Sequence, residues 1–142
     1  ISEIALKNSD IDLRIKALER LKELKYENDR LYKKVFKREV NPRAKSLAMQ
    51  LVEDQGWLKD RWSEHKTSWI GELAASLITD TDFLKKVVLQ KSSPKTVENV
   101  LKNIKDKNTL RQIYLQTEDP EVEQYVKKEL KIAILKKISS LL

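Results

Sequence analysis

All three prolines of this chain fall at one repeated position, and this placement constrains the fold more than any other feature of the sequence. Five segments align with one another in steps of 31, 26, 26 and 26 residues. Their first residues are Ile1, Tyr32, Leu58, Leu84 and Leu110. In this alignment Pro42, Pro94 and Pro120 share one column. Because self-similarity at a period of roughly 20 to 50 residues is typical of stacked repeats, the chain is predicted to be a repeat array.

The column before the prolines holds residues that cap helices. It consists of Asp10, Asn41, Thr67, Ser93 and Asp119. The side-chain oxygen of such a residue accepts a hydrogen bond from the first helical turn. Proline is favoured at the next position, where its missing N–H costs nothing. Each repeat is therefore predicted to contain a helix that begins just after this column, and the predicted helices cover 11–24, 42–54, 68–79, 94–105 and 120 onward.

Three apolar columns follow the cap at offsets of 3, 7 and 11, which together form one stripe along a helix. The first column holds Leu13, Ala44, Ile70, Thr96 and Val122. The second holds Ala17, Ala48, Ala74, Val100 and Val126. The third holds Leu21, Val52, Ile78, Ile104 and Leu130. The small residues of the second column favour a close approach of neighbouring helices.

A shorter apolar segment precedes each capped helix and is predicted to form the first helix of a pair. This segment has two apolar columns. The first holds Ile1, Tyr32, Leu58, Leu84 and Leu110. The second holds Ile4, Val35, Arg61, Val87 and Ile113. Arg61 interrupts the second column, so Trp57 and Trp62 are expected to fill buried positions there. Gly56 is expected at a helix C-terminus, where a left-handed residue is often needed. The longer first step places extra residues within 21–29, where a helix or its loop is expected to lengthen.

The last repeat differs, because no turn signal follows Leu130 and apolar residues continue at helical spacing. These residues are Ile132, Leu135, Ile138 and Leu142. One long closing helix is predicted over about 120–140. It is interpreted as an end cap, and the alternatives are a helix that binds a partner or one that docks onto a neighbour or a continuation of the array. The whole chain, 1–142, is predicted to be a single repeat domain.

Two stretches resemble short HEAT-type repeats. They are Ile1 to Leu21, with Asn8, Asp10 and Arg14, and Leu110 to Leu130, with Asp119-Pro120. The resemblance extends over almost the whole chain. It implies an all-α fold in which about five helix pairs stack into a right-handed solenoid, and it implies a scaffold that binds other proteins.

HEAT-type repeats often carry an acidic residue six positions before an arginine, and these residues form a polar ladder along the stack. Asn8 with Arg14 and Glu39 with Lys45 match or nearly match this spacing. The later repeats depart from it: the pairs there are His65 with Gly71, Lys91 with Val97, and Thr117 with Glu123. The ladder is therefore expected only in the first two repeats, and Gly71 is expected to allow a close approach of a neighbouring backbone.

Composition excludes several kinds of site. The chain has no cysteine, which excludes disulfides and thiolate metal sites. It has one histidine, His65, which excludes a His-based zinc site, and two glycines, too few for a Gly-rich phosphate loop. No pair of carboxylates is set in an apolar sequence context that would separate their pKa values. We therefore predict a non-enzymatic protein without cofactor or metal.

All three tryptophans lie within 13 positions, together with Asp60. Tryptophan is enriched at binding hot spots. The composition of Trp57, Trp62, Trp69 and Asp60 is similar to that of a HEAT-like family of DNA glycosylases, which surrounds a damaged nucleotide with Trp and Asp. The competing interpretation assigns Trp57 and Trp62 to the core. Trp69 shares its column with polar residues, so it is the best candidate for an exposed aromatic contact.

The net charge is +7, and the basic residues form two patches. One patch consists of Lys33, Lys34, Lys37, Arg38, Arg43 and Lys45. The other consists of Lys85, Lys86, Lys91, Lys95, Lys102, Lys105 and Lys107. An acidic repeat at 58–83 separates them. Each patch is interpreted as a solvated face, and the alternatives are contact with nucleic acid or with an acidic protein.

The main functional hypothesis is a protein-binding scaffold whose second helices build the contact surface. Its partner is expected to be another protein of acidic character. The expected contact residues are Trp69, Arg43, Lys45, Lys95, Trp62 and Asp60. The alternative is a nucleic-acid-binding HEAT-like protein related to the DNA glycosylases of that fold. No membrane partner is expected, because no apolar run approaches the roughly 20 residues that span a bilayer, and a cytoplasmic location is predicted.

Overall fold

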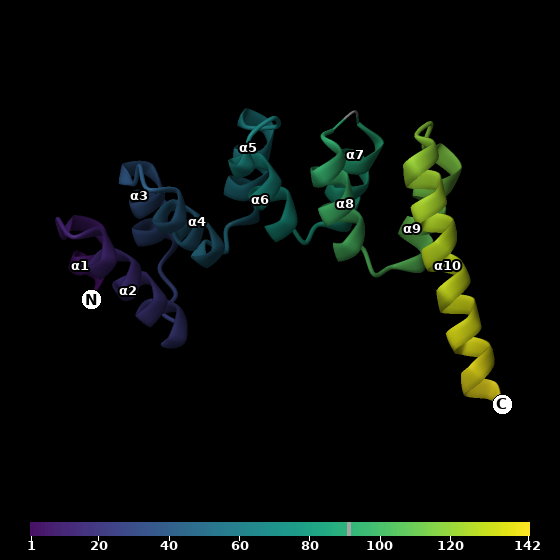
Figure 1. Ribbon diagram of the computed structural model, residues 1–142, viewed down its shortest axis with the longest axis horizontal. Helices are drawn as coiled ribbons and strands as arrows, with labels where there is room; N and C mark the ends of the chain where they lie inside the picture. Colours follow the sequence, from purple (N-terminus) through teal and green to yellow (C-terminus); the bar gives the residue numbers. More distant parts are fainter. Residues whose placement is uncertain (91) are drawn as a thin grey trace. The chain divides into compact units, whose positions relative to one another are not determined.

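The computed structural model describes residues 1–90 and 92–142, and the described chain consists of ten α-helices with no strand (Figure 1). The helices of odd number are α1 (Ser2–Lys7), α3 (Asp29–Arg38), α5 (Gln55–Glu64), α7 (Thr81–Leu89) and α9 (Lys107–Gln116). Those of even number are α2 (Ile11–Glu23), α4 (Pro42–Leu51), α6 (Trp69–Leu77), α8 (Pro94–Asn103) and α10 (Pro120–Leu141). The all-α prediction is confirmed.

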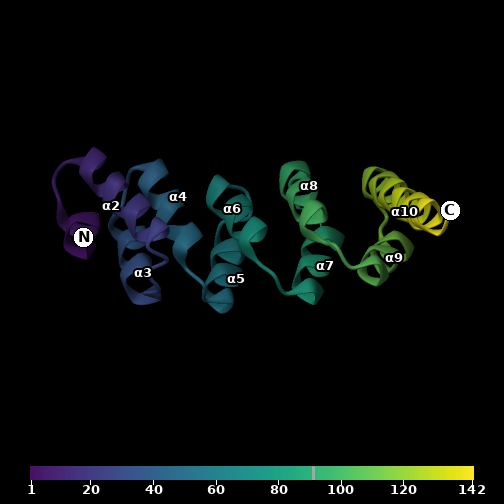
Figure 2. The ribbon, with the colours of Figure 1, turned by 90° about the horizontal axis from the view of Figure 1, so that it is seen from below.

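The helices gather into two compact units, residues 1–61 and 62–142, whose boundary lies within α5. In unit 1, α1 packs against α2 and α3, and α4 packs against α2 and α3 (Figures 1 and 2). Each helix pair thus places its first helix on the neighbouring first helix and its second on the neighbouring second. The prediction of a single repeat domain over 1–142 stays a prediction.

Unit 2 shows the same alternation. Helix α6 packs against α8, α7 packs against α8 and α9, and α9 packs against α10 (Figures 1 and 2). Short helices stacked in this way bury apolar stripes that no single pair covers alone.

The predicted helix starts are confirmed at four of five positions. At these four positions a side-chain oxygen caps the helix that follows, and the capping residues are Asp10, Asn41, Ser93 and Asp119. The first turns of α4, α8 and α10 contain Pro42, Pro94 and Pro120. The prediction for Thr67 is wrong, because α6 begins one residue later, after Ser68, which makes no side-chain cap hydrogen bond. The turn at residues 65–68, where the Ser68 amide donates to the His65 carbonyl, sets this later start.

The core follows the column at offset 7 throughout: Ala17, Ala48, Ala74, Val100 and Val126 are all buried. A further buried column at offset 8 was not expected, and it holds Leu18, Met49, Ala75 and Leu101. Leu13, Ile1 and Ile4 were expected in the core but are 43%, 54% and 44% exposed. The contacts of α1 and α2 cover Ala5, Ile15 and Leu18 instead, so the buried face of this pair is rotated from the expected stripe.

The loops correct the expectation for Gly56 and confirm the expectation of a longer loop within 21–29. Gly56 lies in the first turn of α5 rather than at a helix C-terminus, and no described glycine has a positive φ. The left-handed residue is Lys25, with φ 52°, just after α2. The extra residues of the first repeat therefore form a loop over 24–28, held by a 2.5 Å hydrogen bond that the Tyr32 hydroxyl donates to the Tyr26 carbonyl.

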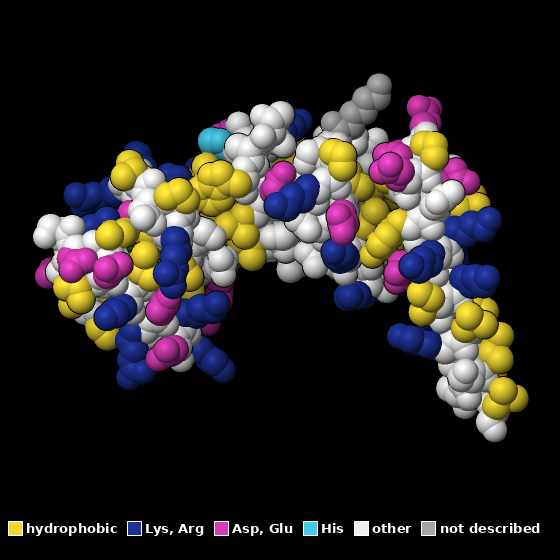
Figure 3. All heavy atoms as spheres, viewed as in Figure 1, with side chains coloured by type: hydrophobic (Ala, Val, Ile, Leu, Met, Phe, Trp, Pro, Cys, Tyr) yellow, Lys and Arg dark blue, Asp and Glu magenta, His cyan; other side chains and the backbone are white. Residues whose placement is uncertain are grey.

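The last helix is a single rod of 22 residues, as predicted. Its first half contacts α9 and buries Val122 and Val126. Its second half extends past α9 and carries exposed apolar side chains beside lysines (Figure 3). The exposed apolar residues are Ile132, Ile134, Leu135, Ile138, Leu141 and Leu142.

Candidate functional site

Helix α3 carries a row of cations along one face. Asn28 caps the helix by accepting from the Leu31 amide, and Leu31, Tyr32, Val35 and Phe36 form its buried side. The helix has five basic residues, of which Arg38 is its last residue. The other four, Arg30, Lys33, Lys34 and Lys37, are spaced i, i+3, i+4 and i+7. They therefore share one stripe that is about 10 Å long at 1.5 Å per residue. Amphipathic spacing therefore produces both the packed face and the charged one.

This row forms one wall of a groove in unit 1. The hollow has a volume of about 670 Å³. It is lined by Arg30, Lys33, Lys34, Phe36, Lys37, Lys45, Trp57 and Arg61. Helix α3 supplies five of these side chains, α4 supplies Lys45, and α5 supplies the other two. Among the described residues that line it there is no carboxylate, so the groove concentrates positive charge over aromatic rings.

The two aromatic residues of the groove contact each other and two of its cations. Phe36 and Trp57 meet edge to face, with ring centroids 5.1 Å apart and planes at 86°. Lys45 Nζ lies 4.1 Å from the Phe36 centroid, and Arg61 Cζ lies 5.0 Å from that of Trp57. Both distances are within the range of cation–π attraction. The rings therefore help to fix the positions of two of the cations.

Lys45 is fixed further by backbone acceptors. Its Nζ donates to the carbonyls of Phe36, at 2.7 Å, and Glu39, at 3.3 Å. Burial lowers the pKa of Lys45 from its ordinary value, and the nearby charge of Glu39 acts in the opposite direction. The ammonium group thus joins the end of α3 to the start of α4 and presents a positioned charge to the groove.

Lys33 lies beside a carboxylate that offsets its charge. Its Nζ lies 2.7 Å from Asp54 Oδ2. The hydrogen bond from Lys33, followed by that from the Trp57 amide, lowers the pKa of Asp54. Asp54 is therefore ionised at neutral pH, and it both offsets the charge of Lys33 and caps the start of α5 through the Trp57 amide at 3.1 Å.

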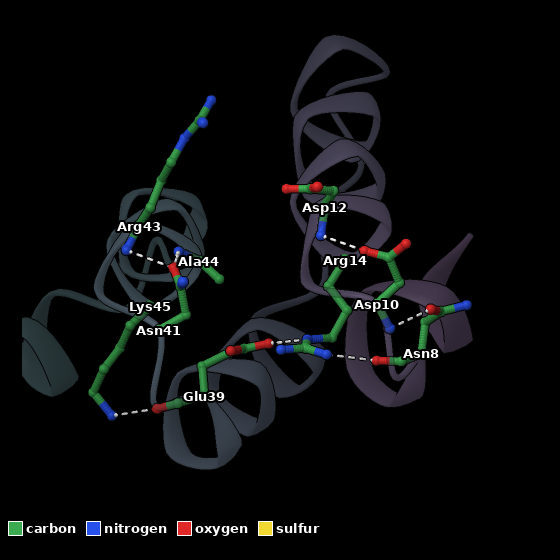
Figure 4. A network of polar contacts seen from close by, with 9 residues as sticks. All are labelled: Asn8, Asp10, Asp12, Arg14, Glu39, Asn41, Arg43, Ala44 and Lys45. Carbon is green, nitrogen blue, oxygen red and sulfur yellow. Dashed lines mark hydrogen bonds and ion pairs between the residues drawn. The ribbon is translucent and has the colours of Figure 1, made fainter.

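The predicted polar ladder is present in unit 1 and sets the position of Lys45 (Figure 4). Arg14 donates from Nη1 to the Asn8 carbonyl and from Nε to Glu39 Oε1, each at 2.6 Å. The Glu39 carbonyl in turn accepts from Lys45. The ladder therefore runs from α1 to the α3–α4 junction, and the side chains of Arg14 and Glu39 are only 18% and 5% exposed.

In unit 2, Gly71 holds the repeat position that Arg14 and Lys45 hold in unit 1. The backbone of a neighbouring segment lies close to it, as expected. A Cβ on Gly71 would lie 2.0 Å from the His65 carbonyl oxygen. Glycine is needed here for lack of space, not for its backbone freedom. The expected position of Lys91 in this column lies outside the described residues.

The six predicted contact residues are divided between the two units, with Arg43, Lys45 and Asp60 in unit 1 and Trp62, Trp69 and Lys95 in unit 2. Lys45 lines the groove, whereas Arg43 lies outside it and pairs with Glu19 at 3.0 Å. Asp60 is exposed and is not among the residues of the groove. In unit 2, Trp69 is 41% exposed, as the polar column around it suggested, and Lys95 is exposed with its Nζ 3.9 Å from Glu72.

Trp62 belongs to the core rather than to a contact surface. It is 3% exposed and meets Phe83 edge to face at 5.6 Å. This supports the competing interpretation of the tryptophan cluster for Trp62. Trp57 is half-buried and lines the groove, so the three tryptophans have three different environments.

The two basic patches predicted from the sequence also have different surroundings. Four members of the first, Lys33, Lys34, Lys37 and Lys45, line the groove, whereas Arg38 and Arg43 do not. Members of the second are interleaved with acidic or amide groups: Lys102 pairs with Glu98 at 3.0 Å, and Lys85 donates to Gln112. The hollow that Lys102, Lys105 and Lys107 line also contains Glu129.

Three residues of the groove were not expected from sequence: Arg30, Phe36 and Arg61. The signal for Arg30 was present in the i, i+3, i+4, i+7 spacing of basic residues at 30–37. Phe36 and Arg61 gave no such signal, because their place depends on how α5 packs beside α3.

The described residues contain no group of three or more His, Asp or Glu side chains arranged to hold a metal ion. Within the same residues, no helix combines the length and apolar character needed to cross a bilayer. No family model matches the chain, and no curated protein and no solved structure shows significant similarity to it.

Proposed function

We propose that this chain is a non-enzymatic binding module, built of HEAT-like helix pairs that continue as a right-handed solenoid, and that the groove of unit 1 binds the phosphate backbone of a nucleic acid. The observation that carries the proposal is the set of six cations and two aromatic rings that line one hollow without a carboxylate. This combination is typical of surfaces that follow a nucleic-acid backbone.

The arrangement of the charges favours a polymer of phosphates over a single anion. Arg30, Lys34 and Lys37 lie along about 10 Å of one helix face, and Lys45 and Arg61 face them from α4 and α5. A row of this length suits anionic groups repeated along a chain. Neutralising several phosphates releases counterions, which supplies most of the affinity of such a surface. An acidic protein segment, the partner first expected, is the alternative outcome of the test.

The test compares matched charge removals. We expect Lys34→Ala/Lys37→Ala to weaken binding of a fluorescein-labelled oligonucleotide at least 10-fold in fluorescence polarisation at low salt. Lys127→Ala/Lys128→Ala removes the same charge from exposed positions on α10 of unit 2 and should change the affinity less than 2-fold. Equal effects of the two double variants would show non-specific attraction, and tighter binding of a poly-glutamate peptide than of any oligonucleotide would favour the acidic protein partner.

A second candidate function, the protein-binding scaffold, is favoured by one observation in unit 2. Trp69 exposes 41% of its surface in the first turn of α6, and an exposed tryptophan is a common centre of a protein contact. We expect Trp69→Ala to leave the melting temperature within about 2 °C, because surface substitutions usually change stability little, while abolishing association with a protein partner. A large loss of stability would show that Trp69 is structural. The cytoplasmic location stays a prediction.

A further inference from the structure

We infer that the groove of unit 1 accepts single-stranded nucleic acid rather than a duplex. This inference rests on the proposed function, since it specifies the form of nucleic acid that the same groove binds. It follows from the position of its aromatic rings and from the cations around them.

The lining of the hollow places both aromatic rings among its six cations. A single strand has a flexible backbone and unpaired bases, so its phosphates can contact the cations while a base contacts a ring. A duplex keeps its bases paired and stacked inside, so it contacts the same surface through its phosphates alone.

The groove offers an aromatic surface on which an unpaired base can stack. Trp57 is half-buried, Phe36 meets its ring edge to face, and the Arg61 guanidinium lies 5.0 Å from its centroid. Bases of single strands stack on aromatic side chains and on guanidinium planes. In a duplex the bases are already stacked on one another, so this surface contributes to binding only when a base is unpaired.

The fixed cations set the expected salt dependence. Six cations line the groove. Asp54 offsets the charge of Lys33, and Arg61 makes further contacts within the protein, so Arg30, Lys34, Lys37 and Lys45 are left to meet phosphates. For single strands the logarithm of affinity falls with the logarithm of salt with a slope of about −0.7 per phosphate, so four contacts give a slope no steeper than about −2.8. A duplex, whose bases do not reach the rings, should give weaker binding at every salt concentration.

The experiment measures polarisation with three probes: a labelled 12-nucleotide oligothymidylate, a labelled 12-base-pair duplex and unlabelled inorganic polyphosphate as a competitor. We expect the single strand to bind at least 10-fold more tightly than the duplex. Trp57→Leu should weaken the single strand about 10-fold while changing polyphosphate competition less than 2-fold. Trp57→Phe should retain most of the affinity, and its melting temperature shows that the groove is intact.

The matched control is Trp69→Leu, which removes an exposed tryptophan from unit 2 and should leave all three probes unchanged. A duplex that binds as tightly as the single strand overturns the inference and leaves the proposed function standing. Equal affinities of Trp57→Leu and the unchanged protein for oligothymidylate also overturn it. If neither nucleic acid binds, the proposed function and the inference both fail.

Discussion

The two units use one helix-pair design but solve the junction between pairs differently. In unit 1, the C-cap residues of α1 and α3 are Asn8 and Glu39. Arg14 and Lys45 lie six positions after them, and their long side chains reach back to hydrogen-bond with Asn8 and Glu39. In unit 2 the equivalent positions hold Gly71 and Val97, and Gly71 lies directly against the His65 backbone. The same repeat therefore tolerates a polar bridge or a direct backbone contact at this position, because the residues at offset 7 are buried within each unit in either case.

The comparison extends to charge. Six of the seven arginines lie in residues 1–61, and the cations of one helix face in unit 1 converge on a groove without carboxylates. In unit 2, lysines such as Lys102 and Lys95 lie near acidic side chains. A similar number of positive charges thus creates a concentrated site in one unit and a dispersed surface in the other. Function follows the placement of the charges rather than the net charge.

The largest expected effect comes from breaking the bridge of unit 1. Glu39→Ala removes the carboxylate that pairs with Arg14 in a nearly dry environment. Removing one partner of a buried ion pair leaves the other charge uncompensated, so we expect a loss of about 3 kcal/mol in the free energy of unfolding. Urea denaturation followed by circular dichroism measures it. Glu23→Ala removes a carboxylate from the exposed pair with Arg20 and serves as the control; a similar loss there would contradict the structural role of the bridge.

The second prediction concerns the close contact of unit 2. Gly71→Ala places a methyl group against the His65 carbonyl, which is backbone and cannot swing away. We expect a loss of about 2 kcal/mol, since overpacking typically costs 1 to 3. Gly56→Ala is the matched control, because its Cβ would meet the Asp54 carboxylate only at 3.4 Å. Thermal unfolding of the two variants compares them, and equal melting temperatures would show that the turn at 65–68 adapts freely.

The third prediction compares a helix cap of unit 1 with one of unit 2, and its expected effect on stability is smaller. Asn41 caps α4 by accepting from the amides of Arg43 and Ala44, so Asn41→Ala should cost about 1 kcal/mol. Ser68 makes no such bond to α6, and Ser68→Ala should change stability by less than about 0.5 kcal/mol. Chemical denaturation of both variants tests the difference. A larger cost for Ser68 would mean that its 3.3 Å bond to the His65 carbonyl stabilises the turn.

The smallest expected effect is a change in oligonucleotide affinity when the negative charge beside Lys33 is removed. Asp54→Asn keeps an oxygen that can cap α5 but removes the negative charge beside Lys33. We expect oligonucleotide affinity to rise about 2- to 3-fold, with a slightly steeper salt dependence as one more cation becomes available. Asp60→Asn removes an exposed carboxylate of the same unit that does not line the groove and should have less effect. Lower affinity of Asp54→Asn would contradict the role given to Lys33.

Sequence predicted best what local chemistry decides. The prolines and the oxygens of Asp10, Asn41 and Asp119 fix helix starts through bonds within a few residues, and the small residues of the offset-7 column occur inside almost any helix stack. The sequence-based predictions were wrong where packing against another helix or an adjoining turn determines the structure. Leu13 is exposed because the packed face of α2 is rotated, and α6 begins late because of the preceding turn.

The candidate site was only partly predictable for the same reason. The lysines at 33–37 and Lys45 are close in sequence, so their clustering was visible as a basic patch. Trp57 and Arg61 join them only through the packing of α5 beside α3, which no local pattern encodes. Lys95 and Trp69 lie in unit 2, so shared columns in the sequence did not identify residues of the groove in unit 1.

The long last helix has an energetic consequence for local opening. Its buried side chains, Val122 and Val126, lie in its first two turns, whereas Ala133 is the one half-buried residue among those described after Leu130. Regions with few buried apolar contacts open locally at a lower free energy than the packed core. Amide protons beyond Leu130 should therefore exchange with solvent faster than those near Val126, while the packed turns stay closed.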